Sequence, residues 1–295
     1  MAATARPRRS VLYMPGSNAR ALEKARGLAA DAIIMDLEDA VAPDAKAAAR
    51  GQIAAALKTG GYGKRELVVR VNGLGTPWGF DDLRAMAVVG ADALLVPKVE
   101  SADMVRQTLR LIDEAGAPQS CQLWCMMETP IGILNAAEIA GASGRLGALV
   151  MGTSDLTKDL HARHTVMRLP MLTALSICLL AARAHGLAIL DGVHLDLADD
   201  AGFVEACRQG AELGFDGKTL IHPKTIEPAN RAYAPSEQEV SWSRRIIDAH
   251  AEAARQGKGV VLVEGKLIEN LHVENARRLV ALADGIKALE AAAGA

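Results

Sequence analysis

Apolar residues occur along this chain in short continuous runs, and longer stretches with helical spacing separate them. The runs do not alternate between apolar and polar positions, which is typical of strands that are covered on both faces of a parallel sheet. All but one of the runs end at a Gly, Pro, polar or charged residue. The pattern predicts eight strands, at residues 9–15, 32–38, 66–72, 93–99, 122–128, 146–152, 187–192 and 217–223.

Ala-rich stretches with helical periodicity lie between these runs, for example at residues 19–30, 44–58 and 101–116. Eight strands that alternate with helices predict an α/β protein with a (β/α)8 TIM barrel. A doubly wound sheet fits less well, because no Gly-rich dinucleotide fingerprint follows the first strand.

The chain continues past the eighth strand with a helical pattern at residues 236–257, an extended piece at 258–269 and a last helical pattern at 275–292. A barrel does not need this tail. We therefore expect a barrel catalytic domain over residues 1–257 and a C-terminal helical lid extension over 258–295 that covers the barrel or reaches a neighbouring subunit.

Composition and net charge indicate which classes of binding partner the sequence favours. The net charge of −2 gives no general attraction for nucleic acid or for an acidic membrane surface. No segment has the pattern of a signal peptide or of a membrane span. The four cysteines contain no C-x-x-C pair, so we expect reduced core thiols in a cytoplasmic protein that binds neither nucleic acid nor membrane.

Polar side chains follow nearly every predicted strand. In a (β/α)8 barrel the chemistry takes place at the C-terminal ends of the strands, so these residues are the candidates for a site. They are Ser17, Asn18, Asp36, Glu38, Asp39, Arg70, Asn72, Lys98, Glu128, Asp155, Asp191 and His222.

Glu128 and Asp155 follow adjacent strands, so their carboxylates can converge at the barrel mouth. Oxygen ligands without a nearby His or Cys favour a hard cation such as Mg²⁺. The alternative is that each carboxylate pairs with an Arg or Lys at the rim, and spacing alone leaves both open.

Arg70 and Lys98 are cations at the ends of apolar strands. The guanidinium of Arg70 can bind a substrate carboxylate through two hydrogen bonds, or it can form a structural ion pair with Asp36 or Glu38. Lys98 could form a Schiff base with a carbonyl substrate. A pairing with Glu100 or with the acidic residues of the second strand is the more ordinary role.

The loop after the first strand leads into a helix, and it carries Ser17, Asn18, Arg20 and Lys24. Free backbone N–H groups at such a helix start can bind phosphate, with the two cations assisting. The alternative is that Ser17 or Asn18 simply caps the helix.

Seven motifs together resemble one family. They are "RSVLYMPGSNARALEKA", "DLEDAVAPDAKAAAR", "VRVNG", "LLVPKVE", "METPIG", "MGTSDL" and "GFDGKTLIHP". In this order they are similar to the citrate lyase beta subunit-like branch of the HpcH/HpaI aldolase superfamily, which includes malyl-CoA and citramalyl-CoA lyases. The resemblance spans almost the whole chain.

The resemblance implies a Mg²⁺-dependent carbon–carbon lyase that cleaves a 3-hydroxyacyl-CoA to acetyl-CoA and a 2-oxo acid. It implies that Glu128 and Asp155 hold Mg²⁺ and that Arg70 binds the 2-oxo acid carboxylate. The acidic residues Asp36, Glu38 and Asp39 would lie on the substrate side. Ser17, Asn18, Arg20 and Lys24 would lie near the phosphates of coenzyme A.

The lid segment departs from the lyase pattern. The family's G-K-x-x-D segment carries a catalytic Asp that reaches a neighbouring subunit, whereas this chain has Glu269 in "EGKLIENLHV". One extra methylene changes which atom the carboxyl group reaches. The "EN-L-H" ending also resembles the malyl-CoA thioesterases of the family, which hydrolyse the thioester.

Lyase activity is thus the first expectation and (3S)-malyl-CoA thioesterase activity at the same site is the alternative. A citrate lyase beta subunit that acts on an acyl carrier protein is a further alternative, and a barrel that binds acyl-CoA without turnover is the last. By resemblance, the protein is expected to be a homo-oligomer, either a trimer or a hexamer.

Overall fold

The structure, a computed structural model, describes residues 6–293. Within them the chain forms two compact units, and the boundary lies between Tyr233 and Ala234. The first unit is Arg8–Tyr233 and holds the barrel. The sequence pattern placed the boundary at residue 257 instead. The helix over residues 237–255 belongs to the second unit, because its apolar face packs there on the rest of the C-terminal segment.

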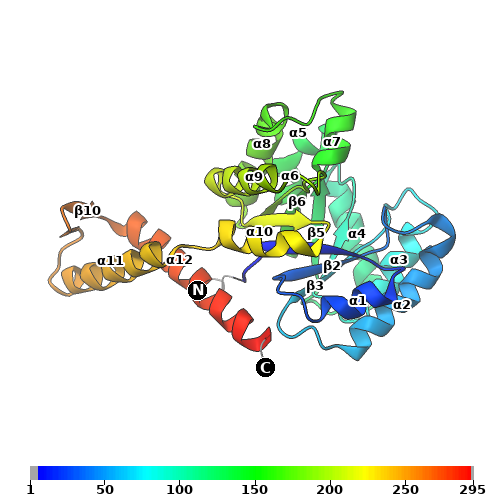
Figure 1. Cartoon of the computed structure of the whole chain (residues 1–295), viewed down its shortest axis with the longest axis horizontal. Coiled ribbons are helices and arrows are strands. Elements are labelled where there is room, and N and C mark those ends of the chain that lie inside the picture. The colour runs from blue at the N-terminus through cyan, green and yellow to red at the C-terminus, as the bar shows by residue number, and fades with distance from the viewer. Residues whose placement is uncertain (1–5, 294–295) are drawn as a thin grey trace. The chain divides into compact units, whose positions relative to one another are not determined.

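Eight parallel strands form a closed barrel in sequence order, and the eighth strand pairs with the first. This confirms the predicted (β/α)8 fold (Figure 1). The strands are β1 Ser10–Pro15, β2 Ala32–Asp36, β3 Glu66–Arg70, β4 Ala93–Val96, β5 Gln122–Met127, β6 Leu146–Met151, β7 Ala188–Asp191 and β8 Gly217–Leu220.

All eight strands lie where the apolar runs predicted them, but most end one to three residues earlier. Asp36, Arg70 and Asp191 are the last residues of their strands, whereas Glu128 and Asp155 follow theirs. The register of β1, β2 and β3 places their C-terminal ends side by side. Pro15 lies opposite Asp36, and Asp36 lies opposite Arg70. The sheet therefore brings polar side chains from distant parts of the chain to one mouth.

Alternate strand residues face the barrel interior, where Ile34, Val68, Trp124 and Leu190 belong to one buried cluster. The intervening residues, such as Ile189, pack outward against the helices in a second, larger cluster. This two-layer core is why the strands are apolar on both faces.

Helices surround the barrel (Figure 1). Local signals start and end them: the Ser101 side chain caps α4 by accepting from the Met104 N–H, and Gly214 ends α9 with a left-handed backbone. They are α1 Ala19–Ala25, α2 Lys46–Thr59, α3 Gly79–Met86, α4 Ala102–Glu114, α5 Pro130–Leu134, α6 Ala136–Ala140, α7 Thr153–Asp159, α8 Leu172–Ala184, α9 Asp200–Leu213 and α10 Ile226–Tyr233, with short 3-10 turns at Pro43–Ala45, Leu169–Met171 and Pro223–Thr225.

The C-terminal unit consists of two helices and a small hairpin. α11 Glu237–Arg255 starts with a capping box, and α12 is Asn270–Ala293. Between them β9 Val261–Val263 and β10 Lys266–Ile268 pair antiparallel, joined by a turn whose two residues both have positive φ. The extended piece predicted at residues 258–269 is this hairpin. The last helix begins at Asn270, earlier than the pattern predicted.

All four cysteines are buried and unpaired. Among the helices of residues 6–293, none is long and apolar enough to cross a membrane.

Candidate active site

Glu128 follows β5 at the mouth of the barrel, and its side chain is 3% exposed. One carboxylate oxygen accepts the backbone N–H of Lys98 at 2.8 Å. The other lies beside Gly152, where any Cβ would come within 2.3 Å of it. Burial raises the pKa of Glu128, although Lys98 opposes the shift. The residue therefore carries a buried charge that calls for a cation.

The segment after Glu128 is built to hold it in place. The Thr129 hydroxyl accepts the Gly132 N–H at 3.1 Å and caps the short helix α5. Pro130 takes the first helical position, where a missing N–H costs nothing. Gly132 passes so close to the Val99 carbonyl that a Cβ would lie 2.4 Å from that oxygen. The sequence "ETPIG" thus fixes the turn that carries the carboxylate.

Asp155 lies in the first turn of α7, on the loop side of β6. Partial burial acts to raise the pKa of Asp155, but hydrogen bonds from Lys158 and Lys98 hold it below its ordinary value. Lys98 contacts both carboxylates: its Nζ lies 3.2 Å from Asp155 Oδ2 and 3.9 Å from Glu128 Oε1. The two predicted metal ligands therefore converge on one point, as their adjacent strands suggested.

Arg70 forms the structural ion pair that the sequence left open. Its Nε and Nη2 each donate to Asp36 at 2.7 Å, which makes a two-pronged pair buried at the ends of β3 and β2. The Tyr13 ring stacks on the guanidinium at 4.8 Å. The remaining nitrogen, Nη1, lies 2.7 Å from Glu38 and 3.5 Å from Asp39.

Asp36 has no capacity left for a substrate. Besides Arg70, its two oxygens accept the backbone N–H groups of Glu38 and Ala40 at 2.9 and 3.1 Å. Both oxygens of Asp36 therefore serve to orient Arg70 and the turn after β2. Glu38 and Asp39 on that turn are the members of the acidic cluster that reach Nη1.

Glu38 is the most perturbed carboxylate of this group. Burial raises the pKa of Glu38 to about 7, although Arg70 works against the shift, while Asp39 and Glu128 add to it. Its Oε2 lies at ion-pair distance from Arg70 Nη1, yet no N–H points at that oxygen. The contact between Glu38 Oε2 and Arg70 Nη1 is therefore poorly aligned, and an incoming carboxylate can replace it.

The loop after β1 has exposed polar residues. Asn18 is the cap of α1, since its side chain accepts the Ala21 N–H at 3.0 Å, so the capping alternative is correct for Asn18. Ser17 is exposed beside it. Arg20 and Lys24 are also exposed, and neither has an ion pair within residues 6–293. These two cations remain available to an anion.

Two strand-end residues lie outside the site. Asp191 points outward from β7, where Arg168 and Lys218 neutralise it at 2.7 and 2.8 Å. His222 caps the turn after β8 by accepting the Lys224 N–H on Nδ1 at 3.1 Å. A list of strand ends does not distinguish the two faces of a strand, so the sequence could not exclude Asp191. Arg168 and Tyr13 were not singled out by the sequence at all.

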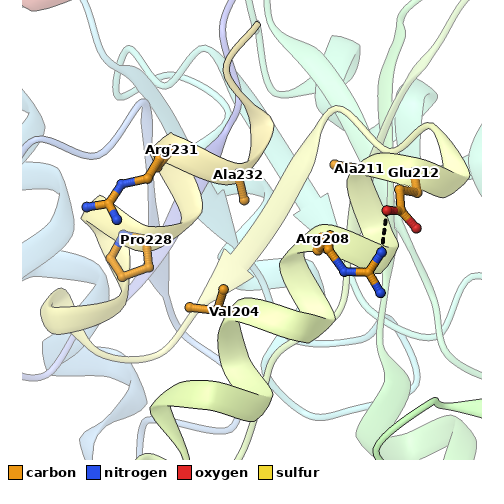
Figure 2. Close-up of a pocket in the computed structure, with 7 residues that line it drawn as sticks. All are labelled: Val204, Arg208, Ala211, Glu212, Pro228, Arg231 and Ala232. Carbon is orange, nitrogen blue, oxygen red and sulfur yellow. Dashed lines mark hydrogen bonds and ion pairs between the residues drawn. The ribbon is translucent and has the colours of Figure 1, made fainter. Parts of the chain in front are cut away.

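A hollow of about 530 Å³ lies between α9 and α10 on the outer helical layer. Figure 2 shows Val204 and Pro228 facing it and the ion pair between Arg208 and Glu212 on α9. Its lining is mostly apolar and carries none of the residues of the mouth. The hollow is therefore separate from the candidate site at the barrel mouth.

Glu269 lies in the C-terminal unit, directly before α12. Its backbone N–H donates to His272 Nδ1 at 3.1 Å, which closes the start of that helix. Its carboxylate has no hydrogen bond or ion pair to other residues that the structure describes.

Comparison with known proteins agrees with this geometry. The sequence model of the HpcH/HpaI aldolase/citrate lyase family matches residues 9–223, which include every residue of the mouth. The chain belongs to this family. It is therefore an enzyme of the family that its seven motifs resemble.

Individual relatives cover nearly the whole chain. A (3S)-malyl-CoA thioesterase of Cereibacter sphaeroides is 52% identical over 99% of this chain and 100% of its own length. The citrate lyase subunit beta of Leuconostoc mesenteroides is 38% identical over 95% and 94%. The crystal structure of CitE from Mycobacterium tuberculosis with magnesium, acetoacetate and coenzyme A has a TM-score of 0.75 and 31% identity, covering 96% of this chain and 100% of that chain.

The mouth can hold a divalent cation. Five carboxylates gather there against the three cations Arg70, Lys98 and Lys158. No group of three or more His, Cys, Asp or Glu that could hold a metal occurs in the described part of the chain. Glu128 and Asp155 are a pair of carboxylates that converge at the mouth beside Lys98. Mg²⁺ typically takes one or two carboxylates and completes its shell with water and substrate oxygens.

Proposed function

We propose that this protein is a Mg²⁺-dependent enzyme that hydrolyses (3S)-malyl-CoA or a close relative to the free dicarboxylate and coenzyme A. The observation that carries the proposal is the 52% identity, over both full lengths, to a (3S)-malyl-CoA thioesterase. The proposal puts hydrolysis before cleavage, whereas the expectation from the sequence alone put cleavage first and hydrolysis as its alternative.

We place Mg²⁺ on Glu128 and Asp155. The buried charge of Glu128, the excess of carboxylates at the mouth and the magnesium in the related CitE structure all support this placement. Bound Mg²⁺ polarises substrate oxygens as a Lewis acid and neutralises the charge that develops on them.

Arg70 binds the carboxylate of the malyl group in this proposal. Asp36 fixes the guanidinium through two hydrogen bonds, so Nη1 points in one direction without reorganisation. The substrate carboxylate takes the position of Glu38 beside Nη1, and Glu38 carries its negative charge only weakly near neutral pH because its pKa is about 7. In this exchange one carboxylate contact at Nη1 replaces another.

Coenzyme A binds across the loop after β1. Arg20 and Lys24 are exposed cations without ion pairs in the described part of the chain, and they suit phosphate groups. Ser17 and Asn18 lie beside them at the start of α1. Each of these contacts is expected to be modest, because surface charges are screened by solvent.

Glu269 acts as the general base. Its carboxylate takes a proton from water as the water oxygen attacks the thioester carbon; the carbon–sulfur bond breaks and the thiolate leaves with a proton from solvent. We propose that the side chain reaches the mouth of a neighbouring subunit, which requires a homo-oligomer, either a trimer or a hexamer. We further propose that the enzyme works in the cytoplasm.

Carbon–carbon cleavage at the same site is the second candidate. The CitE complex with acetoacetate, magnesium and coenzyme A supports it, because that set of ligands suits the products of such a reaction. The third candidate is the same chemistry on a substrate that is attached to an acyl carrier protein. The similarity to citrate lyase subunit beta supports it.

A product assay separates these reactions. Purified protein is given (3S)-malyl-CoA with Mg²⁺, and the products are separated by liquid chromatography. We expect malate and free coenzyme A. Glyoxylate and acetyl-CoA would establish cleavage instead, activity only after adding an acyl carrier protein would establish the third candidate, and no product from malyl-CoA or citramalyl-CoA would refute the proposal.

A further inference from the structure

Lys98 has an unusual backbone conformation directly after β4. Its φ is 51°, in the left-handed region that residues other than Gly rarely adopt. Such strain persists only where the surroundings enforce it, and it occurs often at functional sites. Lys98 therefore warrants a role beyond that of a surface lysine.

The conformation lets Lys98 hold both proposed metal ligands at once. Its backbone N–H donates to Glu128 Oε1 at 2.8 Å, and its ammonium donates to Asp155 Oδ2 at 3.2 Å. The same ammonium lies 3.7 Å from Glu38 Oε1 and 3.9 Å from Glu128 Oε1. Three carboxylates from three strand ends thus surround one positive charge.

The ammonium can leave this position, whereas the carboxylates cannot easily follow. The Lys98 side chain is 45% exposed, but those of Glu38 and Glu128 are 12% and 3% exposed. A flexible cation therefore occupies the point where a divalent cation would be held.

We propose that the Lys98 ammonium is a built-in counter-ion that holds Glu128 and Asp155 together in the metal-free enzyme and is displaced when Mg²⁺ binds. The inference rests on the proposed assignment of these two ligands. Once displaced, the ammonium remains tethered at the mouth by its fixed backbone and faces the anionic substrate. Lys98 is then a positioning residue, and it lowers the intrinsic affinity for metal by competing for the same oxygens.

The direction of one affinity change distinguishes this role from simple support. If the Lys98 ammonium competes with the metal ion, replacing Lys98 by a neutral residue increases the affinity for metal. If the ammonium only orders Asp155, the same replacement decreases that affinity. Mn²⁺ is a suitable probe because free Mn²⁺ is measured directly by electron paramagnetic resonance without any substrate. We expect Lys98→Gln to bind Mn²⁺ about tenfold more tightly than the wild type, since a like charge near the ion is removed.

Matched variants isolate the cause. Lys98→Arg keeps the charge and is expected to bind Mn²⁺ within about threefold of the wild type. Lys158→Gln removes the other ammonium on Asp155, which is 66% exposed and screened, so we expect less than about a threefold change. Glu128→Gln tests the ligand itself and should lose most of the binding.

The displacement of the Lys98 ammonium can also be measured on the wild-type protein, so the test does not depend on whether a variant folds. Mild acetylation followed by mass spectrometry reports how reactive each amine is. We expect Mg²⁺ to increase labelling of Lys98 severalfold relative to an exposed reference such as Lys58. Unchanged or reduced labelling of Lys98, or a Lys98→Gln variant that binds Mn²⁺ no more tightly than the wild type, would overturn the inference; wild-type binding by Glu128→Gln would instead overturn the ligand assignment.

Discussion

Glu38 makes the pH dependence of stability a direct probe of the mouth. Burial raises the pKa of its carboxyl from 4.5 to about 7 in the folded protein. The folded chain therefore keeps a proton between pH 4.5 and 7 that the unfolded chain releases. The stability linked to this group is fully present below pH 4.5 and is lost as pH rises through about 7.

The size of the effect follows from the shift. A difference of roughly 2.5 pKa units corresponds to about 3 kcal/mol, at 1.36 kcal/mol per unit. Solvent screening removes little of it, because the Glu38 side chain is only 12% exposed. Glu38→Gln imitates the protonated form at every pH, so it should match the wild type near pH 4.5 and exceed it by up to about 3 kcal/mol at pH 8.

Urea unfolding of the metal-free protein, followed by circular dichroism with chelator present, measures this difference at both pH values. Asp103→Asn is the control, since it removes a carboxylate on α4 that is 90% exposed and should leave the pH dependence close to that of the wild type. If Glu38→Gln follows the wild type at pH 8 as it does at pH 4.5, the carboxyl is not held neutral by burial and the reasoning fails.

Further predictions concern the supports of the site. Arg70→Lys keeps the charge but loses the two-pronged pair with Asp36, so kcat/KM should fall about 100-fold in a steady-state assay, run at a temperature where circular dichroism shows that the variant is folded. Gly152→Ala forces Glu128 to move, because the new Cβ would lie 2.3 Å from its Oε2; Mn²⁺ affinity should weaken at least about tenfold, and an unchanged affinity would mean that Glu128 is not a ligand. Asp191→Asn leaves Arg168 and Lys218 partly unpaired in the core and should destabilise the barrel by about 3 to 5 kcal/mol in urea unfolding, whereas Asp200→Asn, which breaks an exposed pair with Lys224, should cost less than about 1 kcal/mol.

The barrel could be predicted because its signal is local. Each strand is a continuous apolar run because it is covered on both faces. Such a run can be recognised without knowing which strands it pairs with. Glu128 and Asp155 were found for a related reason: adjacent strands place their ends together whatever the details of the loops. The pattern could not reveal that α11 belongs with the C-terminal unit. Helical periodicity identifies an apolar face of a helix but not the element on which that face packs.

Other parts of the site depend on side-chain direction and on backbone strain. The sequence left Arg70 undecided between substrate and Asp36, and only the register of β2 and β3 places the two directly opposite each other. Lys98 was expected to pair with Glu100 or with the acidic residues after β2. It contacts Glu38 of that cluster, but its left-handed backbone turns it toward Glu128 and Asp155 as well, and no composition signal predicts that for a Lys.

The position of the metal is the central claim, and anomalous diffraction from crystals grown with Mn²⁺ in place of Mg²⁺ tests it most directly. We predict one strong peak at the barrel mouth, about 2.1 to 2.2 Å from a carboxylate oxygen of Glu128 and from one of Asp155, with the Lys98 ammonium moved away from both. A peak bound by other residues, or no peak at the mouth in crystals that contain active protein, would contradict the account.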